Sequence, residues 1–562
     1  MNRFFFFKYT LTFFSFLNVL AQSDGSFTIS TKQVSKIDSR IFGQFLEKHT
    51  DELGPEFALN SDSSYMVPEV VAQIKALKIP VVRFPGGTMI DYMDWRAYIK
   101  NTEQRAEKQN VTIWWGKASM PVNFGFDEFF RLKNEAGFEA IVVLNLNDGV
   151  ELKKPLEVVA QENAGALAAY LAAPLQNNLP ENLKIYPELR KKNGHPEPYK
   201  VEYFQLGNEN WFHRDRLLKS GLSKEQVKER FVQATKAYID AIKPICPNAV
   251  FVLEGQLEGG EDMAIPGINK AMAEAASGSK ILFTHHYYLP WGMKTFVRQN
   301  GDTLKPQELT REQIYYGWMS AWVNSATGQS FLEEDEVYTL AKANNWKIAI
   351  TEWNFNTWWN AKKEVKDTIF DSMLGRGLGA ANFLNAMLRK SDMVTMGCQS
   401  MLVGNKWEIA GISVNTKKGQ KPITQPSALV TGLYSNHHGE NLVEVLPQNL
   451  SSYSQPFQIT WLKPCPKVAY VDVVATAGNK KLYLHIINRK YNDKASIKIN
   501  LDGYNITGKG KCFELNGDLI ANPKLSKNMP IARISESVVK VKNEFTLSLN
   551  PHSVSVYEIE LK

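Results

Sequence analysis

The chain has 562 residues, of which 44% are hydrophobic and 22% are charged, a balance typical of a globular protein with more than one domain. Its net charge of +7 comes from 65 basic and 58 acidic residues spread along the chain, and basic runs as short as Arg190–Lys192 predict no nucleic-acid binding. The four cysteines are too scattered for a disulfide framework, and the nine histidines form no ligand pattern with them. We therefore expect no structural metal site and no cofactor.

Residues 1–21 are typical of a secretory signal peptide. Arg3 and Lys8 precede an apolar segment that ends in Val19–Ala21, and we expect cleavage near Ala21. A membrane anchor would need about 20 consecutive apolar residues, and Lys8 interrupts this run. The sequence therefore predicts a secreted or periplasmic protein with no membrane span after signal removal.

Between residues 38 and 435, short apolar segments rich in β-branched residues alternate with longer amphipathic segments. Near-continuous hydrophobic strands that alternate with helices indicate a parallel sheet buried on both faces. Eight such units predict an α/β fold, a (β/α)₈ TIM barrel. The expected strands are Ser39–Glu47, Ile79–Phe84, Ala140–Asn145, Glu202–Gly207, Ala249–Glu254, Ile281–His286, Lys347–Glu352 and Met393–Met401. The expected helices are Met66–Ala76, Phe126–Ala136, Leu156–Ala173, Lys224–Ile242 and Glu334–Asn344.

Residues 436–562 predict a C-terminal antiparallel β-sandwich. Segments such as Val468–Thr476 and Lys481–Asn488 alternate between apolar and polar residues, which is typical of strands with one buried face. Residues 22–37 contain a similar segment, Ser26–Thr31, which we expect to join this sandwich. The sandwich either binds glycan or braces the barrel, and we favour bracing.

Two glutamates follow expected barrel strands, where βα loops carry the active sites of this fold. Glu209 lies within Gly207–Trp211 after the fourth strand, and Glu352 lies within Thr351–Asn354 after the seventh. A pair of carboxyl groups at one barrel mouth is what glycoside hydrolysis needs, since one protonates the leaving oxygen and the other attacks the anomeric carbon. The sequence therefore predicts a glycosidase site.

These segments resemble glycoside hydrolases of clan A, and most closely family 51, the α-L-arabinofuranosidases. The resemblance covers about residues 26–440, with a C-terminal sandwich of the expected kind. Besides the two glutamate motifs, it is carried by Phe42–Glu47, Val81–Gly87, Asp94–Arg96, His285–Tyr288 and Gln399. Phe84 stands where the family usually has tryptophan, so the sugar and the exo or endo mode stay open.

The resemblance implies roles for individual residues. Glu209 is the expected acid/base and Glu352 the expected nucleophile, so Glu352 has to be ionised while Glu209 holds its proton. Asn208 is expected to donate to the sugar hydroxyl beside the anomeric centre, and Tyr288 to the nucleophile's carboxylate. The other expected sugar-binding residues are Glu47, His286 and Gln399. His286 is equally consistent with a hydrogen-bonded core histidine.

Tryptophans after the nucleophile are candidates for sugar stacking. Trp353, Trp358 and Trp359 follow Glu352 closely, although more than half of the 13 tryptophans are expected to serve ordinary core packing. Of these three, Trp353 is our principal candidate.

The resemblance implies a retaining, exo-acting α-L-arabinofuranosidase that removes terminal arabinofuranosyl residues from polysaccharide side chains. One alternative is another clan A activity, such as an endo-β-glucanase or a β-glycosidase acting on a pyranose. A carbohydrate-binding protein without catalysis is a third interpretation, and the presence of both carboxylates disfavours it. The expected partner is a polysaccharide or oligosaccharide, and a homo-oligomer stays open.

Overall fold

The computed structural model describes residues 23–562 except for 49–52, 104, 106–107, 114–115, 177, 294, 325–326, 357–371, 406–408 and 522–530. The expected signal peptide of residues 1–21 lies outside the described residues. Among the residues that are described, no helix is long and apolar enough to cross a membrane.

Eight parallel strands close into a barrel, which confirms the predicted fold. In order around the barrel they are β2 (Gly43–Phe45), β3 (Val81–Phe84), β6 (Glu139–Leu144), β7 (Tyr203–Leu206), β8 (Val250–Glu254), β9 (Lys280–Pro290), β12 (Ile348–Asn356) and β13 (Val394–Ser400). The first strand is shorter than expected. Ser39–Phe42 forms a 3₁₀ turn instead, because the Asp38 carboxylate accepts the backbone N–H of Arg40 and caps it.

Side chains of the barrel strands alternate between the interior and the surrounding helices. An apolar interior layer includes Phe45, Val81, Ile141, Tyr203 and Val252. The Arg83 guanidinium lies 4.3 Å from the centre of the Phe45 ring and bonds to Gln205. The apolar layer therefore supports a polar layer nearer the carboxyl ends of the strands.

The helices pack mainly around the barrel. They are α1 (Pro68–Ala76), α2 (Phe126–Ala136), α3 (Asn147–Glu151), α4 (Leu156–Ala160), α5 (Ala166–Ala172), α6 (Ile185–Lys192), α7 (Trp211–Lys219), α8 (Lys224–Ile242), α9 (Ile268–Ala275), α10 (Arg311–Met319), α11 (Glu336–Ala343), α12 (Met373–Leu388) and α13 (Pro426–Asn436). The expected bounds of α2 and α8 are the observed ones. The start of α8 is fixed by a capping box between Ser223 and Gln226.

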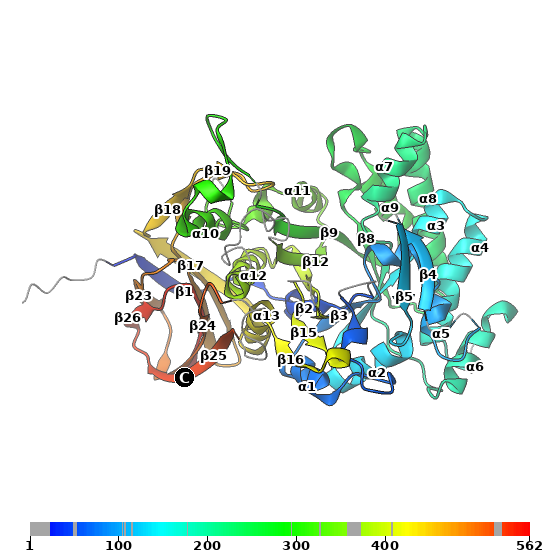
Figure 1. Ribbon diagram of the computed structural model, residues 1–562, viewed down its shortest axis with the longest axis horizontal. Helices are drawn as coiled ribbons and strands as arrows, with labels where there is room; N and C mark the ends of the chain where they lie inside the picture. The colour runs from blue at the N-terminus through cyan, green and yellow to red at the C-terminus, as the bar shows by residue number, and fades with distance from the viewer. Residues whose placement is uncertain are drawn as a thin grey trace, which may run out of the picture.

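The C-terminal residues form the sandwich as a nine-stranded, strongly curved sheet (Figure 1). Its strands are β1 (Ser26–Lys36), β17 (Asn441–Gln448), β21 (Val471–Gly478), β22 (Lys481–Asn488), β23 (Ala495–Asp502), β24 (Ile506–Gly517), β25 (Ala532–Lys540), β26 (Glu544–Leu549) and β27 (Ser553–Leu561). The N-terminal strand β1 lies inside this sheet, antiparallel to β17 and parallel to β23.

Smaller sheets of two or three strands lie outside the barrel and the nine-stranded sheet. Their strands are β4 (Lys108–Ile113), β5 (Gly116–Pro121), β10 (Phe296–Arg298), β11 (Thr303–Leu304), β14 (Val403–Gly404), β15 (Ile412–Asn415), β16 (Gln420–Thr424), β18 (Ser452–Gln455), β19 (Phe457–Gln458) and β20 (Cys465–Ala469). One of these sheets joins the domains, because β10 of the barrel insertion pairs with both β11 and β19.

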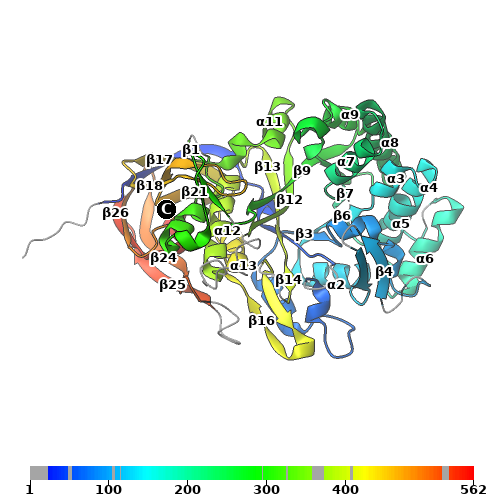
Figure 2. The ribbon, with the colours of Figure 1, turned by 45° about the horizontal axis from the view of Figure 1, so that its top comes forward.

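Helix α12 lies between barrel and sandwich in both ribbon views (Figures 1 and 2), and all of its residues are buried. Arg389, just after α12, forms an ion pair with Asp472 of β21. Burial by itself raises the pKa of Asp472, but the charges of Arg389 and Arg489 outweigh burial and hold the pKa below its usual range. The two domains are thus joined by a buried helix and by charged hydrogen bonds.

Candidate active site

The two glutamates predicted for catalysis lie together at the carboxyl ends of β7 and β12. The nearest side-chain oxygens of Glu209 and Glu352 and a ring nitrogen of His286 all lie within 4.8 Å of one another. Glu352 is buried, whereas the Glu209 side chain is 22% exposed. One carboxyl group is thus enclosed by protein, and the other faces open space.

Three side chains hold the Glu352 carboxylate. Arg83 Nη1 lies 2.5 Å from Oε1, Tyr288 donates to Oε2 at 2.7 Å, and His286 Nδ1 lies 3.7 Å from Oε1. Burial raises the pKa of Glu352, but the charges of His286 and Arg83 and the Tyr288 hydrogen bond together lower it below its ordinary value. Glu352 is therefore an oriented anion, as a nucleophile needs to be.

Glu209 sits on a strained turn between β7 and α7. Its φ of 45° lies in the left-handed region, which a residue with a side chain rarely adopts. The buried Glu254 carboxylate at the end of β8 accepts the backbone N–H groups of Asn210 and Gln256, both at 3.0 Å. His286 contacts Glu209 Oε1 at 3.2 Å and Thr351 at 3.0 Å through its two ring nitrogens. These contacts fix the loop and the side chain of Glu209.

A small polar corner adjoins the Glu352 carboxylate. The Glu47 Oε1 atom accepts the backbone N–H of Gly87 at 3.0 Å, and Asn208 Oδ1 accepts from Arg83 at 2.6 Å. A Cβ atom at Gly87 would lie 2.9 Å from both Glu352 Oε1 and Glu47 Oε1 and 3.6 Å from Asn208 Oδ1. Any side chain at position 87 would therefore collide with the carboxyl groups of Glu352 and Glu47.

Six of the eight predicted site residues meet at this site, and two do not. The side chain of Gln399 faces α13, where it accepts from the Thr431 hydroxyl at 2.7 Å, because its neighbours Cys398 in the barrel core and Ser400 at Tyr288 point to the other face of β13. Trp353 is fully buried against Phe383 of α12. The sugar contacts expected of Gln399 and Trp353 therefore stay predictions, because these side chains lie apart from the other six. Trp358 and Trp359 lie outside the described residues.

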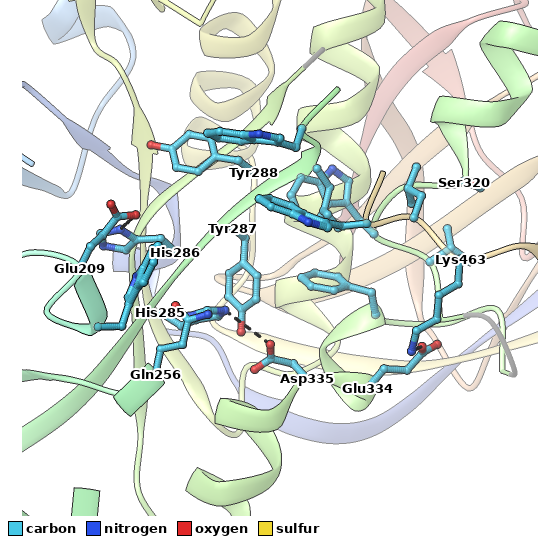
Figure 3. A pocket seen from close by; sticks show the side chains of 18 of the residues that line it. Glu209, Gln256, His285, His286, Tyr287, Tyr288, Ser320, Glu334, Asp335 and Lys463 are labelled. Atoms are coloured by element: carbon cyan, nitrogen blue, oxygen red, sulfur yellow. Dashed lines mark hydrogen bonds and ion pairs between the residues drawn. The ribbon is translucent and has the colours of Figure 1, made fainter. Parts of the chain in front are cut away.

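A cavity of about 570 Å³ opens beside Glu209. Glu209, His286 and Tyr288 line it, and Figure 3 shows that His285, Tyr287 and Asp335 line it as well. Its other lining residues are Trp211, Phe212, Gln256, Leu289, Trp291, Ser320, Trp322, Val323, Phe331, Glu334, Trp461, Leu462 and Lys463. Glu209, one of the paired carboxyl groups, therefore borders a space large enough for sugar rings.

The chain matches two family models. Residues 73–294 match the α-L-arabinofuranosidase 1 domain, and residues 352–553 match the α-L-arabinofuranosidase C-terminal domain. The chain belongs to glycoside hydrolase family 51. It is therefore a glycoside hydrolase, as the sequence predicts.

Individual relatives of this family 51 chain match most of its length. A probable α-L-arabinofuranosidase C of Aspergillus niger is 22% identical over 94% of this chain and 96% of its own. The α-L-arabinofuranosidase C of Emericella nidulans is 23% identical over 87% of this chain and 88% of its own. The solved structure of a thermostable family 51 α-L-arabinofuranosidase from Thermotoga petrophila is 22% identical, with a TM-score of 0.66 over 95% of this chain and all of that one. This structural similarity establishes the shared fold.

Three residues that hold the site of this family 51 chain were given no role by the sequence. Arg83 lies inside the segment Val81–Gly87. Its position within an apolar strand could have indicated a buried anion nearby, because a buried arginine needs one. Glu254 is a carboxylate at the end of a barrel strand, β8, which is the feature that drew attention to Glu209 and Glu352. Ser400, which bonds to the Tyr288 hydroxyl at 2.7 Å, carried no signal of its own.

The cluster of Glu209, His286 and Glu352 has enough donors for a cation, but its charge does not favour one. The Arg83 guanidinium already neutralises Glu352. Burial lowers the pKa of His286, yet the charges of Glu352 and Glu209 outweigh burial and raise it. A raised pKa favours the charged imidazole, which repels a cation, so this family 51 site fits proton transfer better than metal binding.

The raised pKa of Glu47 makes the free energy of unfolding of this enzyme depend on pH. Burial, followed by the charge of Glu352, raises the pKa of Glu47 to about 8. In the unfolded chain its pKa is about 4.3. The folded state therefore keeps a proton that the unfolded chain releases between these values, and the stability falls as pH rises through this window.

Glu47→Gln removes this titration and retains an oxygen for the Gly87 N–H. We expect the Tm of the variant, relative to wild type, to rise by several degrees between about pH 5 and about pH 9. Differential scanning calorimetry across this range measures it. A Tm difference that is independent of pH would show that Glu47 titrates normally.

Proposed function

We propose that this enzyme is a retaining, exo-acting α-L-arabinofuranosidase that removes terminal arabinofuranosyl residues from polysaccharide side chains. The observation that carries the proposal is the pair Glu209 and Glu352, with one carboxyl group held as an anion and the other facing the cavity. Retaining glycosidases place their two carboxyl groups about 5–5.5 Å apart, closer than inverting enzymes do. The separation within 4.8 Å between Glu209 and Glu352 oxygens supports the retaining mechanism.

In the first step, a Glu352 oxygen attacks the anomeric carbon. The bond from this carbon to the glycosidic oxygen breaks, and that oxygen takes the proton of Glu209. Tyr288 and Arg83 orient the attacking carboxylate through the bonds described above. The products are a glycosyl ester on Glu352, the freed leaving group and an ionised Glu209.

In the second step, Glu209 takes a proton from water while the water oxygen attacks the anomeric carbon. The ester bond to Glu352 breaks, and both glutamates return to their starting states. His286, between the two carboxyl groups, compensates the negative charge that moves from one to the other. Each carboxyl group thus has a distinct environment for a distinct role.

The arabinofuranosyl specificity rests on the named relatives and on the polar corner. The side-chain oxygens of Glu47 and Asn208 lie close around Gly87, directly beside Glu352, which suits hydrogen bonds to the hydroxyls of one terminal sugar. Glu47 is protonated at neutral pH because its pKa is raised, so its carboxyl group can both donate to and accept from sugar hydroxyls. With its oxygen bound to Arg83, Asn208 presents its amide NH₂ as a donor.

Sizing the earliest products tests the substrate and the exo mode. Arabinoxylan, arabinan and a β-glucan are digested side by side, and the products of the first few per cent of reaction are separated. We expect free arabinose from the first two polymers and no product from the β-glucan. Oligosaccharides without free arabinose would contradict the proposal and favour the endo-acting alternative.

We further propose that the chain is exported, on the composition of residues 1–21. Expression of the full chain in a secreting host, followed by N-terminal sequencing of the extracellular protein, tests this. We expect a new N-terminus close to Ala21. Retention of the intact chain inside the cell would contradict export.

A further inference from the structure

The cavity beside Glu209 lies on the leaving-group side of the site. Glu209, the proposed acid, lines it, whereas Glu352, Glu47 and Asn208 do not. Because the acid protonates the glycosidic oxygen, the group beyond that oxygen has to extend from Glu209 away from Glu352. What the cavity binds is therefore the part of the substrate that leaves.

A hairpin of the C-terminal domain reaches this cavity. Ile459 and Leu462 form a two-way backbone pair and are buried, which leaves Thr460 and Trp461 at the tip. The Thr460 hydroxyl donates to the carbonyl oxygen of Gly292, in the loop after β9, at 2.7 Å. This bond and the pairing of β19 with β10 attach the hairpin to the barrel.

Trp461 forms an aromatic surface with Trp291. The two rings stack with centroids 5.3 Å apart and an angle of 23° between their planes. Trp291 has a φ of 73°, in the left-handed region that a residue with a large side chain rarely adopts. Its ring also contacts Tyr288 edge-on at 6.0 Å, and Tyr288 bonds to Glu352. The aromatic surface thus continues from the catalytic residues to the C-terminal domain.

The Trp461 side chain is 60% exposed, although the hairpin that carries it has a buried base. Exposed aromatic surface beside a cavity is typical of a binding site. Polar groups line the same cavity, namely Gln256 and the ion pair between Lys463 and Glu334 at 2.9 Å (Figure 3). Flat apolar rings framed by such groups match a sugar ring that has C–H faces and equatorial hydroxyls.

We propose that Trp461 and Trp291 form a subsite for a pyranose ring of the leaving chain, so that the C-terminal domain takes part in substrate binding. This inference rests on the proposed role of Glu209 as the acid. A pyranose with equatorial hydroxyls presents a flat face to a tryptophan, whereas a furanose ring is puckered. The subsite therefore selects side chains carried on a pyranose backbone over those carried on an arabinan.

The kinetic test compares Trp461→Ala with wild type on two substrates. In an arabinoxylotetraose the leaving group reaches the subsite, and in arabinofuranosyl fluoride it is a single atom. We expect kcat/KM to fall about tenfold on the oligosaccharide and to stay within about twofold on the fluoride. Trp461→Phe should recover part of the loss. Ile185→Ala, at a 61% exposed position on the distant helix α6, should change neither.

Binding of unsubstituted xylotetraose, measured by titration calorimetry, tests the subsite without catalysis. We expect wild type to bind it and Trp461→Ala to bind it about tenfold more weakly, with weaker binding of arabinotetraose by wild type. Failure of wild type to hydrolyse the fluoride, with Trp461-dependent binding intact, would refute the arabinofuranosidase proposal alone. Equal losses on both substrates, no loss on either, or a preference for arabinotetraose would overturn the subsite.

Discussion

Glu352→Ala is expected to lower kcat by more than about 10⁴-fold on any substrate, because no other group is placed to attack the anomeric carbon. The structure gives the reason for such a large effect. Arg83, Tyr288 and His286 all converge on this one carboxylate, and none of them can replace it as a nucleophile. Steady-state rates on an aryl arabinofuranoside measure the loss.

Controls separate the loss of chemistry from a loss of fold. Removing Glu352 leaves Arg83 and His286 without the carboxylate that both contact, so the circular dichroism spectrum and Tm of the variant have to be recorded. Azide should restore turnover and give a glycosyl azide of inverted configuration, because it attacks directly from the emptied side. Glu181→Ala, at an exposed carboxylate, should leave kcat unchanged. Near-normal activity of Glu352→Ala would refute the assignment.

Glu209→Ala is expected to lower kcat/KM by about 10²–10⁴-fold on substrates with poor leaving groups, since general acid assistance contributes that much. A substrate with a good leaving group does not need the proton. For it, we expect the glycosyl-enzyme to form at nearly the wild-type rate and then to accumulate, because no base activates water. A burst of released leaving group in stopped-flow measurements reports this accumulation.

Azide distinguishes this variant from the previous one. It should speed the second step of Glu209→Ala and give a glycosyl azide of retained configuration, because two successive displacements then occur. The opposite configurations of the two azide products provide an internal control. If both classes of substrate lose activity equally and azide has no effect, Glu209 has another role.

Much of the barrel could be predicted because apolar residues recur at regular spacing in its helices and form short continuous runs in its strands. Helices α2 and α8 have the bounds that their amphipathic pattern indicates. Helix α12 was missed for a physical reason, since it is buried on all sides and has no polar face to produce a period. The β4–β5 hairpin, Lys108–Pro121, was also missed.

The candidate site was predictable where a residue type and its strand end coincide, as for Glu209, Glu352 and Asn208. Gln399 and Trp353 lie apart from the other six predicted site residues because each is adjacent on its strand to a residue that faces the site, Ser400 or Glu352. Successive side chains of a strand point to opposite faces. Trp461 was out of reach for a different reason. It lies 109 residues after Glu352 in another domain, and only folding brings it to the cavity.

Trapping of the covalent intermediate tests the central claim, that Glu352 attacks and Glu209 assists, most directly. A 2-fluoro-arabinofuranoside with a good leaving group forms the glycosyl ester but loses it slowly, because fluorine destabilises the oxocarbenium-like transition state. After incubation, the intact mass is measured and the labelled protein is digested and sequenced by mass spectrometry. We predict one added sugar per chain, attached to Glu352. A label on another residue, or complete turnover without any label, would contradict the account.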